Sequence, residues 1–530
     1  MRLFVQPVGR WPQPTGVEGA WILLWNSWND FSYRTLFALY REHHGELSRY
    51  GFVKILRRGQ VEHETPLEEG EIVGGRLPED YGSLGQDLDY YERLNELPEP
   101  EKTELLEALG DLATDPAKRA GFAGEPGLAT SLNRDRERPQ DFYEDVSALI
   151  LRGVAAPPRN MRFAFRPVGA HEPIAFDFRG RDDEARQIIP GEPSRRLIVL
   201  VGPNGVGKTS LLASIARVAY AAPRQRDALA REGQFEGDPV FPSVTAVAYS
   251  AFDDFKPPHL DGSSDAEIAR QLREGEGRYA YCGMRDLAHL VEAPGEPARL
   301  LTLDDLGGVF SERIRQLEYM KRMTLLARVL APVFEESSFR PLLAEGAPDP
   351  DELDFQESDI DRLRRFLGDN STEAFGNLSS GHRIVLHLLT NMTATLKRHG
   401  IALIDEPEVH LHPPLLAALM NGLRRLLAAQ NAHAIVATHS PVVVQETLAS
   451  HVMIMEPGGV VRAPASETFG ENTGTLTREI FGLHTDTVDF RRALDALANA
   501  LPSVEAIEAH LGSPLSSPAL AYVAMRLNGR

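Results

Sequence analysis

The sequence contains one cysteine, Cys282, and fewer basic residues than acidic ones. A single cysteine excludes an internal disulfide framework and a cysteine-rich zinc site, and it is typical of chains from a reducing compartment. Lys and Arg number 56 against 76 Asp and Glu, which gives a net charge of −20. A uniformly basic coat for nucleic acid is therefore excluded, whereas a local basic groove is not.

Long apolar runs are also missing. No stretch approaches the ~20 apolar residues that cross a bilayer. Residues 1–7 offer no apolar segment of the kind found in a secretory signal. We therefore expect a cytoplasmic protein that has no membrane among its partners. What remains is an ordinary globular composition, 42% hydrophobic and 25% charged over 530 residues, and this length predicts several sub-domains.

The first part of the chain, residues 1–158, has a pattern of its own. It contains buried-type strand patterns at 21–25 and 51–56, and helical spacing over 33–41. Carboxylates are concentrated over 62–107, and no catalytic motif is visible. We interpret this part as an α+β accessory domain that docks a protein rather than nucleic acid, because its charge repels phosphates.

An aliphatic run at 197–201 leads directly into a full match to G-x-x-x-x-G-K-[ST]. The loop comprises Gly202, Pro203, Asn204, Gly205, Val206, Gly207, Lys208 and Thr209, and Ser210 begins a helical stretch after it. Such a loop turns backbone N–H groups around a β-phosphate at a helix N-terminus. Lys208 can reach the β- and γ-phosphates, and the Thr209 hydroxyl can ligate Mg²⁺. The sequence thus predicts ATP and Mg²⁺ as cofactors.

Two further apolar strands end in polar residues. The strand at 401–404 runs into Asp405 and Glu406. Asp405 is predicted to hold Mg²⁺ together with Thr209, and Glu406 to orient or deprotonate the attacking water. The strand at 434–437 is followed by His439, which could hydrogen-bond the γ-phosphate. We therefore predict Lys208, Glu406 and His439 as the catalytic residues.

A serine- and glycine-containing helix start lies between these motifs. Ser379 and Gly381 precede helical residues 383–390. Serine is a good N-cap, and a helix N-terminus favours an anion. Taken alone, Ser379 and Gly381 indicate only a capped helix. Taken together with the other motifs, they indicate a second contact to phosphate.

These motifs, in this order, resemble those of the ATP-binding-cassette class of ATPases. The phosphate loop, residues 378–382 (LSSGH), Asp405–Glu406 and His439 match that class's Walker A, signature, Walker B and switch histidine. The run 405–413 (DEPEVHLHP) and the long insertion before the signature resemble the SMC, RecF and OLD branch, and the ATPase subunits of anti-phage systems such as Septu. The resemblance covers roughly 160–460.

The resemblance implies an α/β fold: a P-loop NTPase of ABC-ATPase type, with a mixed sheet core and a helical insertion, beside the N-terminal α+β domain. The division that follows is 1–158 for the accessory domain, 159–261 for the first ATPase lobe, 262–375 for the helical insertion, 376–470 for the ATPase part with signature, Walker B and switch histidine, and 471–530 for a helical C-terminal segment.

In this class the ATPase domains of two protomers, called heads, pack head to tail. The resemblance therefore implies that Ser379 and Gly381 act on the ATP of a partner protomer. ATP would then hold a homodimer or higher homo-oligomer together, and hydrolysis at Glu406 would release it. The three functions in view are an ATPase that controls a separate effector in anti-phage defence or DNA processing, a stand-alone RecF- or SMC-like repair ATPase, and the motor of a transporter. The N-terminal block and the long insertion argue against the transporter.

Departures from the pattern refine this expectation. Ser380 and His382 stand where the commonest signature has Gly and Gln, and residues 250–253 contain no lobe-coupling Gln. Only about 90 residues follow His439, without the acidic triad of the Toprim nuclease that OLD proteins carry. We therefore expect any nuclease effector to be another chain.

Two features keep two interpretations each. His410 and His412 form either a metal site or a structural or dimer contact. Residues 311–331 predict one helix closed by Pro332. Its basic residues are either a solvated face or a track for DNA phosphates. These residues are Arg313, Arg315, Lys321, Arg322 and Arg328.

Overall fold

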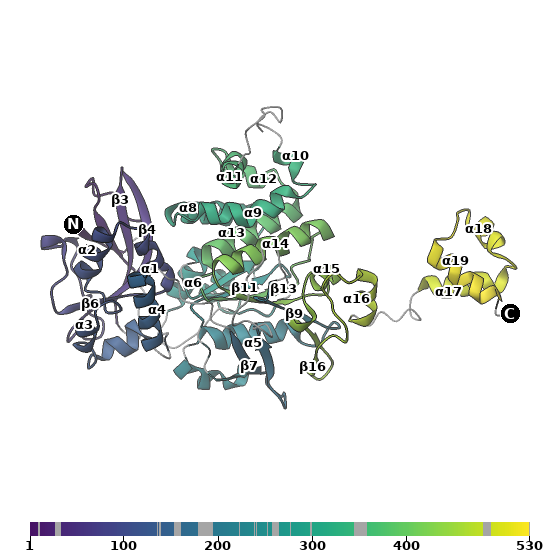
Figure 1. The fold of residues 1–530 in the computed structure, drawn as a ribbon, viewed down its shortest axis with the longest axis horizontal. Helices are drawn as coiled ribbons and strands as arrows, with labels where there is room; N and C mark the ends of the chain where they lie inside the picture. The colour runs from purple at the N-terminus through teal and green to yellow at the C-terminus, as the bar shows by residue number, and fades with distance from the viewer. Residues whose placement is uncertain are drawn as a thin grey trace.

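The computed structural model describes residues 1–8, 11–26, 33–134, 136, 139–152, 161–178, 194–221, 223–237, 239, 241–251, 253–256, 264–275, 277–296, 299–343, 358–480 and 489–528. Within these ranges the strands form a six-stranded, a three-stranded and a seven-stranded sheet. The first sheet belongs to the N-terminal part, and the other two build the centre of the molecule (Figure 1). The fold is a mixed α/β fold.

The N-terminal sheet has the order β5-β1-β2-β3-β4-β6, and all its neighbours are antiparallel except β1 and β2. Its strands are β1 Leu3–Gln6, β2 Trp21–Trp25, β3 Leu36–His43, β4 Glu46–Arg57, β5 Gly70–Glu71 and β6 Tyr81–Gly85. The accompanying helices are α1 Leu88–Asn95, α2 Glu99–Leu109, α3 Pro116–Ala120 and α4 Pro139–Arg152. The strands predicted at 21–25 and 51–56 are confirmed by β2 and β4.

The helix predicted over 33–41 is wrong, because these residues contribute to strand β3. Phe37 and Leu39 point into the main core of this domain, whereas Ala38 and Tyr40 belong to a second apolar cluster on the opposite face of the sheet. Because both faces of the sheet are covered here, residues Leu36–Tyr40 are all apolar, and such a short run cannot be distinguished from a helix by periodicity alone.

The central sheet has the order β12-β11-β13-β14-β9-β15-β16, and only the last pairing is antiparallel. Its strands are β9 Leu197–Val201, β11 Val244–Ala248, β12 Tyr279–Gly283, β13 Ile401–Asp405, β14 His433–Ala437, β15 Val452–Met455 and β16 Val461–Arg462. Strand β14 lies between β9 and β13, with Ala437 paired to Leu200 on one side and to Asp405 on the other. The carboxyl ends of these three parallel strands therefore meet at one edge.

Both faces of the central sheet are buried, as the aliphatic run at 197–201 predicts. In β9, Leu197, Val199 and Val201 pack into the helical core on one face, and Ile198 and Leu200 into the core on the other. The first face is covered by α8 Leu303–Tyr319, α9 Met323–Glu335, α13 Ser380–Thr395 and α14 Pro413–Ala429 (Figure 1). The second is covered by α5 Lys208–Tyr220 and a small sheet of β7 Arg162–Arg166, β8 Ile174–Asp177 and β10 Gln234–Glu236.

The helical insertion contains a break that the sequence pattern does not reveal. Its helices besides α8 and α9 are α6 Asp265–Glu274, α7 Leu287–Glu292, α10 Arg340–Leu343, α11 Asp359–Leu367 and α12 Ser371–Gly376. The single helix predicted over 311–331 is wrong: α8 and α9 are separated at Lys321, which has a φ of 52°. Pro332 lies inside α9 rather than closing it. The carbonyl of Arg328, to which proline cannot donate, instead accepts from Arg425 Nη1 at 3.0 Å.

Two of the five basic residues of this region face inward. Arg313 donates to Asn391 Oδ1 at 3.0 Å and to the carbonyls of Glu274 and Arg273 at the end of α6. Arg322 donates to the carbonyl of Thr393 at 3.4 Å. Both are buried, and they satisfy carbonyl groups near helix C-termini. Arg313 and Arg322 are therefore neither solvated nor open to DNA, whereas Arg315, Lys321 and Arg328 are exposed.

The N-terminal domain contacts the segment that follows α13. Arg398 Nη1 lies 2.8 Å from Glu92 Oε1, and Lys397 Nζ lies 3.7 Å from Asp87 Oδ2. Trp11 stacks on Tyr319 at the end of α8, with 4.7 Å between ring centroids. The accessory domain is thus tied to the far end of the helix that begins at the signature.

The C-terminal part is helical, as predicted. Helices α15 Pro441–Gln445 and α16 Thr473–Glu479 pack against each other, and α17 Asp489–Ala500, α18 Val504–Leu511 and α19 Ser517–Asn528 share a small core. That core consists of Leu494, Ala498, Ile507 and Val523. Within the described ranges, every helix is too short or too polar to traverse a bilayer.

The close packing of α14 on α9 and α13 leads to a first prediction. A Cβ atom at Gly422 would lie 2.6 Å from the Val329 carbonyl oxygen and 2.9 Å from Leu389 Cδ1. Gly422→Ala should therefore destabilise the protein by about 1–3 kcal/mol through overpacking. Gly308→Ala in α8 is the matched control, because its Cβ would meet nothing within 4 Å; it should stabilise by about 0.5–1 kcal/mol. Melting midpoints measure both, and a Gly422→Ala midpoint equal to the wild type would contradict the packing.

Candidate functional site

The loop after β9 has a shape that depends on glycine. Gly202 has a φ of 152°, and a Cβ there would lie 2.2 Å from the carbonyl oxygen of Met455 in the adjacent strand β15. Gly207 has a φ of 97° and is the N-cap of α5. Residues 203–205 form an exposed crest. The strand, loop and helix predicted around the phosphate-binding motif are confirmed.

Lys208 lies buried beneath this crest. Its Nζ donates to the carbonyl oxygens of Gly202 at 3.0 Å and Pro203 at 3.1 Å, and lies 2.8 Å from His439 Nε2. An ammonium group can only donate, so Nε2 accepts and we assign the ring proton to Nδ1. Burial lowers the pKa of His439, and the Lys208 charge lowers it further. Burial also lowers the pKa of Lys208. The pair joins the phosphate loop to the end of β14.

Asp405 meets Thr209 across the sheet edge. The Thr209 hydroxyl donates to Asp405 Oδ2 at 2.8 Å and lies 3.1 Å from Oδ1. Burial raises the pKa of Asp405 from its ordinary 3.8 to about 6, and the hydrogen bond from Thr209 opposes this rise. A carboxylate and a hydroxyl are hard oxygen ligands of the kind that Mg²⁺ prefers. The two predicted metal ligands therefore lie together, and their chemistry fits that ion.

Glu406 lies on the open side of the same cluster. Its φ is 46°, a left-handed conformation that is uncommon for a glutamate and is found preferentially at functional turns. Its backbone N–H donates to the carbonyl of Ala437 at 2.9 Å, and its Oε1 lies 3.5 Å from His439 Nε2. The Glu406 side chain is 34% exposed and that of His439 30%. Glu406 is placed where a general base can reach solvent.

Glu408 is a member of this site that sequence reasoning missed. Its Oε1 accepts from the Thr438 hydroxyl at 2.8 Å and from the backbone N–H of His439 at 2.5 Å. Burial raises the pKa of this carboxyl, and hydrogen bonds from His439 and Thr438 oppose the rise. The only available signal was an acidic residue two positions beyond the Asp–Glu pair.

A carboxylate also stands beside the phosphate loop after β11, where no glutamine is available. Asp254 Oδ2 accepts from the Ser210 hydroxyl at 3.0 Å. Its neighbour Asp253 is buried and bound by Arg285 Nη1 at 3.0 Å and by the Tyr281 hydroxyl at 2.8 Å. Phe252 lies outside the described residues. The segment after β11 therefore touches the nucleotide loop through an aspartate.

The signature residues belong to a different cluster. Ser379 is the N-cap of α13, and its hydroxyl accepts from the N–H of His382 at 3.4 Å and lies 3.0 Å from the Nδ1 atom of the same residue. His382 Nε2 lies 2.9 Å from the Ser338 hydroxyl. A Cβ at Gly381 would lie 3.2 Å from the carbonyl oxygen of His410. The predicted helix start is confirmed, and Ser379 itself is exposed.

His412 has a structural role. It is the N-cap of α14, and its Nδ1 accepts from the N–H of Leu415 at 3.4 Å. Within the described part of the chain, three potential metal ligands come together only at Glu18, His43 and His44. A metal site built on His410 and His412 therefore has no third ligand in that part of the structure.

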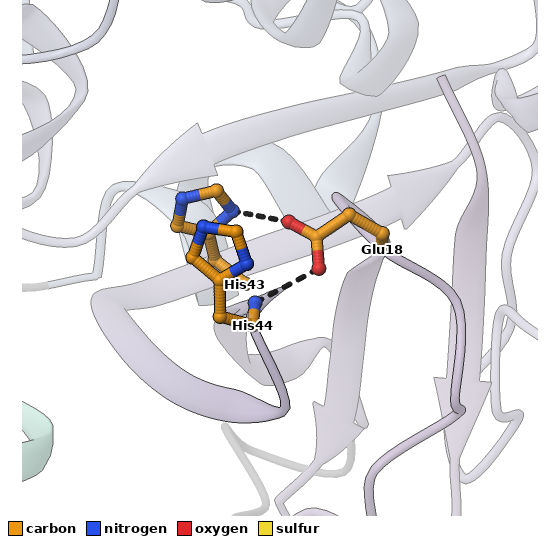
Figure 2. Close-up of side chains that lie close together, drawn as sticks. All are labelled: Glu18, His43 and His44. Atoms are coloured by element: carbon orange, nitrogen blue, oxygen red, sulfur yellow. Dashed lines mark hydrogen bonds and ion pairs between the residues drawn. The ribbon is translucent and has the colours of Figure 1, made fainter.

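The cluster of Glu18, His43 and His44 braces the turn between β3 and β4 (Figure 2). One Glu18 oxygen contacts His43 Nδ1, and the other accepts from the backbone N–H of His44 at 2.8 Å. His44 has a φ of 52°, which places the two imidazoles side by side with centroids 4.1 Å apart. Both carboxylate oxygens are thus engaged in holding the turn.

The phosphate loop, the Asp405–Glu406 strand end and His439 on a parallel sheet define the class: a P-loop ATPase of the ABC or AAA type. A family model described as "AAA domain, putative AbiEii toxin, Type IV TA system" matches residues 289–445. The chain is 31% identical over 510 residues to Protein ea59 of Escherichia phage lambda, covering 91% of this chain and 90% of the relative. The protein therefore belongs to the family of phage lambda ea59.

Solved structures of transporter ATPases share some likeness with the chain. An ABC transporter in an inward-facing conformation has a TM-score of 0.26 and 15% identity, over 60% of this chain and 88% of its own. The ADP conformation of an ATP-binding cassette of an ABC transporter has a TM-score of 0.25 and 13% identity, over 60% and 94%. Neither likeness is close enough to bear on the function.

The raised pKa of Asp405 leads to a second prediction. Its folded-state pKa lies above its unfolded value, so the ionised carboxylate destabilises the fold at neutral pH. This cost decreases as pH falls below about 6 and is gone once pH falls below the ordinary value of 3.8. In chelator-containing buffer near neutral pH, Asp405→Asn should therefore be more stable than the wild type by roughly 1–3 kcal/mol. The difference should shrink toward pH 5.

Thermal melting at several pH values measures this difference. Glu406→Gln is the control, because its partly exposed side chain should change stability little. Mg²⁺ should stabilise the wild type more than Asp405→Asn. An Asp405→Asn protein that is less stable than the wild type across the whole pH range would contradict the assigned environment.

Proposed function

We propose that the protein hydrolyses Mg·ATP, with Lys208, Glu406 and His439 at the reaction centre. One observation carries the proposal. The loops after β9, β14 and β13 bring together Lys208, His439 and Glu406, and beside them the Thr209 hydroxyl and the Asp405 carboxylate. Lys208 would bind the β- and γ-phosphates, Glu406 would take the proton of the attacking water, and His439 would hold the γ-phosphate.

The cradle for the triphosphate is supported by the glycines of the loop. A Cβ at Gly205 would meet nothing within 4 Å, so the crest is open on its outer side, where backbone N–H groups can turn toward phosphate oxygens. Thr209 and Asp405 would hold Mg²⁺ through their oxygens. The ion, when bound, neutralises charge that develops on the phosphates.

Two heads would close on ATP in this proposal, with Ser379 and Gly381 of one protomer facing the other's γ-phosphate. Ser379 and Ser380 are exposed, and the site keeps about a third of the Glu406 and His439 side chains accessible. At a helix N-terminus, a serine hydroxyl can donate a hydrogen bond to an oxyanion, and the positive end of the helix dipole attracts the same negative charge. Both halves of a shared site are thus available on the surface.

The biological setting is proposed from the resemblance to the OLD and Septu ATPases. The ATPase would control a separate effector, of nuclease class, in anti-phage defence or DNA processing. A relative from a bacteriophage shows that this family occurs in phage genomes. The accessory domain, tied at Glu92 and Asp87 to the end of α13, would report head closure to that partner. Exposed Arg315, Lys321 and Arg328 offer a restricted surface for DNA.

Hydrolysis is tested by two substitutions with opposite effects on binding. Lys208→Ala should abolish ATP binding and phosphate release, because the cation under the loop is lost. Glu406→Gln should retain ATP binding and lower phosphate release by about 10²–10⁴-fold, because a base is removed. Radiolabelled ATP retention and phosphate release measure the two. Unchanged phosphate release in both variants would refute the assignment.

Head closure is tested on the Glu406→Gln protein. A pair of distance labels on the heads should report closure on adding ATP, and light scattering should report any change in mass. Adding Ser379→Arg should block closure while ATP still binds at Lys208, because a bulky side chain would enter a close contact. Heads that close equally well with Ser379→Arg would show that the signature assignment is wrong.

A further inference from the structure

We propose that Glu408 is the positioning residue that holds His439 in place for hydrolysis. The inference rests on the proposed ATPase function and names a residue that the predicted catalytic set does not include. Glu408 accepts two hydrogen bonds, and both come from the residues that follow β14. Neither involves Lys208 or the Thr209–Asp405 pair.

Glu408 links the residues that follow two neighbouring strands, β13 and β14. Asp405 at the end of β13 pairs with Ala437 at the end of β14. Three residues beyond Asp405, the chain places Glu408 Oε1 within 2.8 Å of the Thr438 hydroxyl and 2.5 Å of the His439 N–H. One oxygen thus binds two consecutive residues, and one of its bonds is to the backbone that carries the imidazole. Charge-assisted bonds of this kind are stronger than neutral ones.

Only one oxygen of the Glu408 carboxylate, Oε1, makes these two hydrogen bonds. The other carboxylate oxygen, Oε2, is buried and has no hydrogen-bond partner among the described residues. Both hydrogen bonds of Glu408 therefore run to the strand end that carries His439, and the carboxylate is placed to fix that strand end.

A displacement of the His439 imidazole would disturb its contacts with the other two catalytic side chains. Its Nε2 lies 2.8 Å from Lys208 Nζ and 3.5 Å from Glu406 Oε1. Truncating Glu408 would release the backbone at His439 while leaving the phosphate loop intact, because Lys208 is held by the carbonyls of Gly202 and Pro203. Catalysis should therefore suffer more than ATP binding.

The experiment compares Glu408→Ala with the isosteric Glu408→Gln in the full-length protein. Glu408→Ala should lower kcat by about tenfold to a hundredfold, as expected for a displaced catalytic group, and leave KM for ATP within about threefold. Glu408→Gln keeps an oxygen acceptor for both donors, so it should retain at least a third of wild-type kcat. A structural role alone would instead lower the amount of active protein, with the same turnover per bound ATP.

A double mutant then shows whether Glu408 acts through His439. In a His439→Ala background, adding Glu408→Ala should cost less than about twofold in kcat, because the positioned group is already gone. A further loss as large as in the wild-type background would overturn the proposal. So would a Glu408→Ala enzyme with wild-type kcat.

A spectroscopic measurement separates this inference from the proposed function. In histidine-labelled protein without ATP, the ring signal of His439 is identified by its disappearance in His439→Ala. Glu408→Ala should shift or broaden it, and Glu408→Gln should leave it near the wild-type position. A chain that hydrolyses no ATP would refute the proposed function, while this signal still decides the contact; a signal unmoved by Glu408→Ala would overturn the positioning role.

Discussion

The parallel pairing of β9, β14 and β13 is the constraint on which the rest of the site depends. Although β9 ends at Val201 and β14 begins only at His433, all three strands end at one edge because Ala437 pairs with Leu200 and with Asp405. The chain turns immediately after each of them, so the residues beyond the strands are delivered to one place. Lys208, His439 and the Asp405–Glu406 pair are close for this reason and not because of any attraction among themselves.

That convergence has an electrostatic cost, which explains the character of the site. Burial raises the pKa values of Asp405 and Glu408 and lowers those of Lys208 and His439, so burial disfavours the charged form of each group. The cation at Lys208 partly offsets the carboxylates. Sites of this kind exchange stability for function, and a substrate that brings phosphates and a divalent cation would relieve the imbalance.

The helical layer connects this edge to the accessory domain. Helix α13 is capped by Ser379 and ends at Thr395, shortly before Lys397 and Arg398, which pair with the N-terminal domain. Close packing at Gly422 and the inward-facing guanidinium of Arg313 make this layer dense. The helix α13 thus connects Ser379 to the contacts of the accessory domain through closely packed side chains.

The sequence by itself determined the features that depend on neighbouring residues. The glycine loop, the apolar strands that end in Asp405 and His439, and the serine cap at Ser379 follow from short-range stereochemistry and hydrogen bonding. Each could be predicted because the signal and the structure it forms lie within a few residues of each other.

Only the tertiary structure decided features that depend on what a segment packs against. Residues Leu36–Tyr40 of strand β3 are all apolar because both faces of the sheet are covered there, so this pattern imitated a helix. Arg313 carries the same charge as a solvated arginine, and it is held inward by Asn391 and by the carbonyls at the end of α6. Glu408 reaches the backbone of His439, 31 residues away. Burial and partners of this kind are set by long-range strand and helix packing, which no local window of sequence contains.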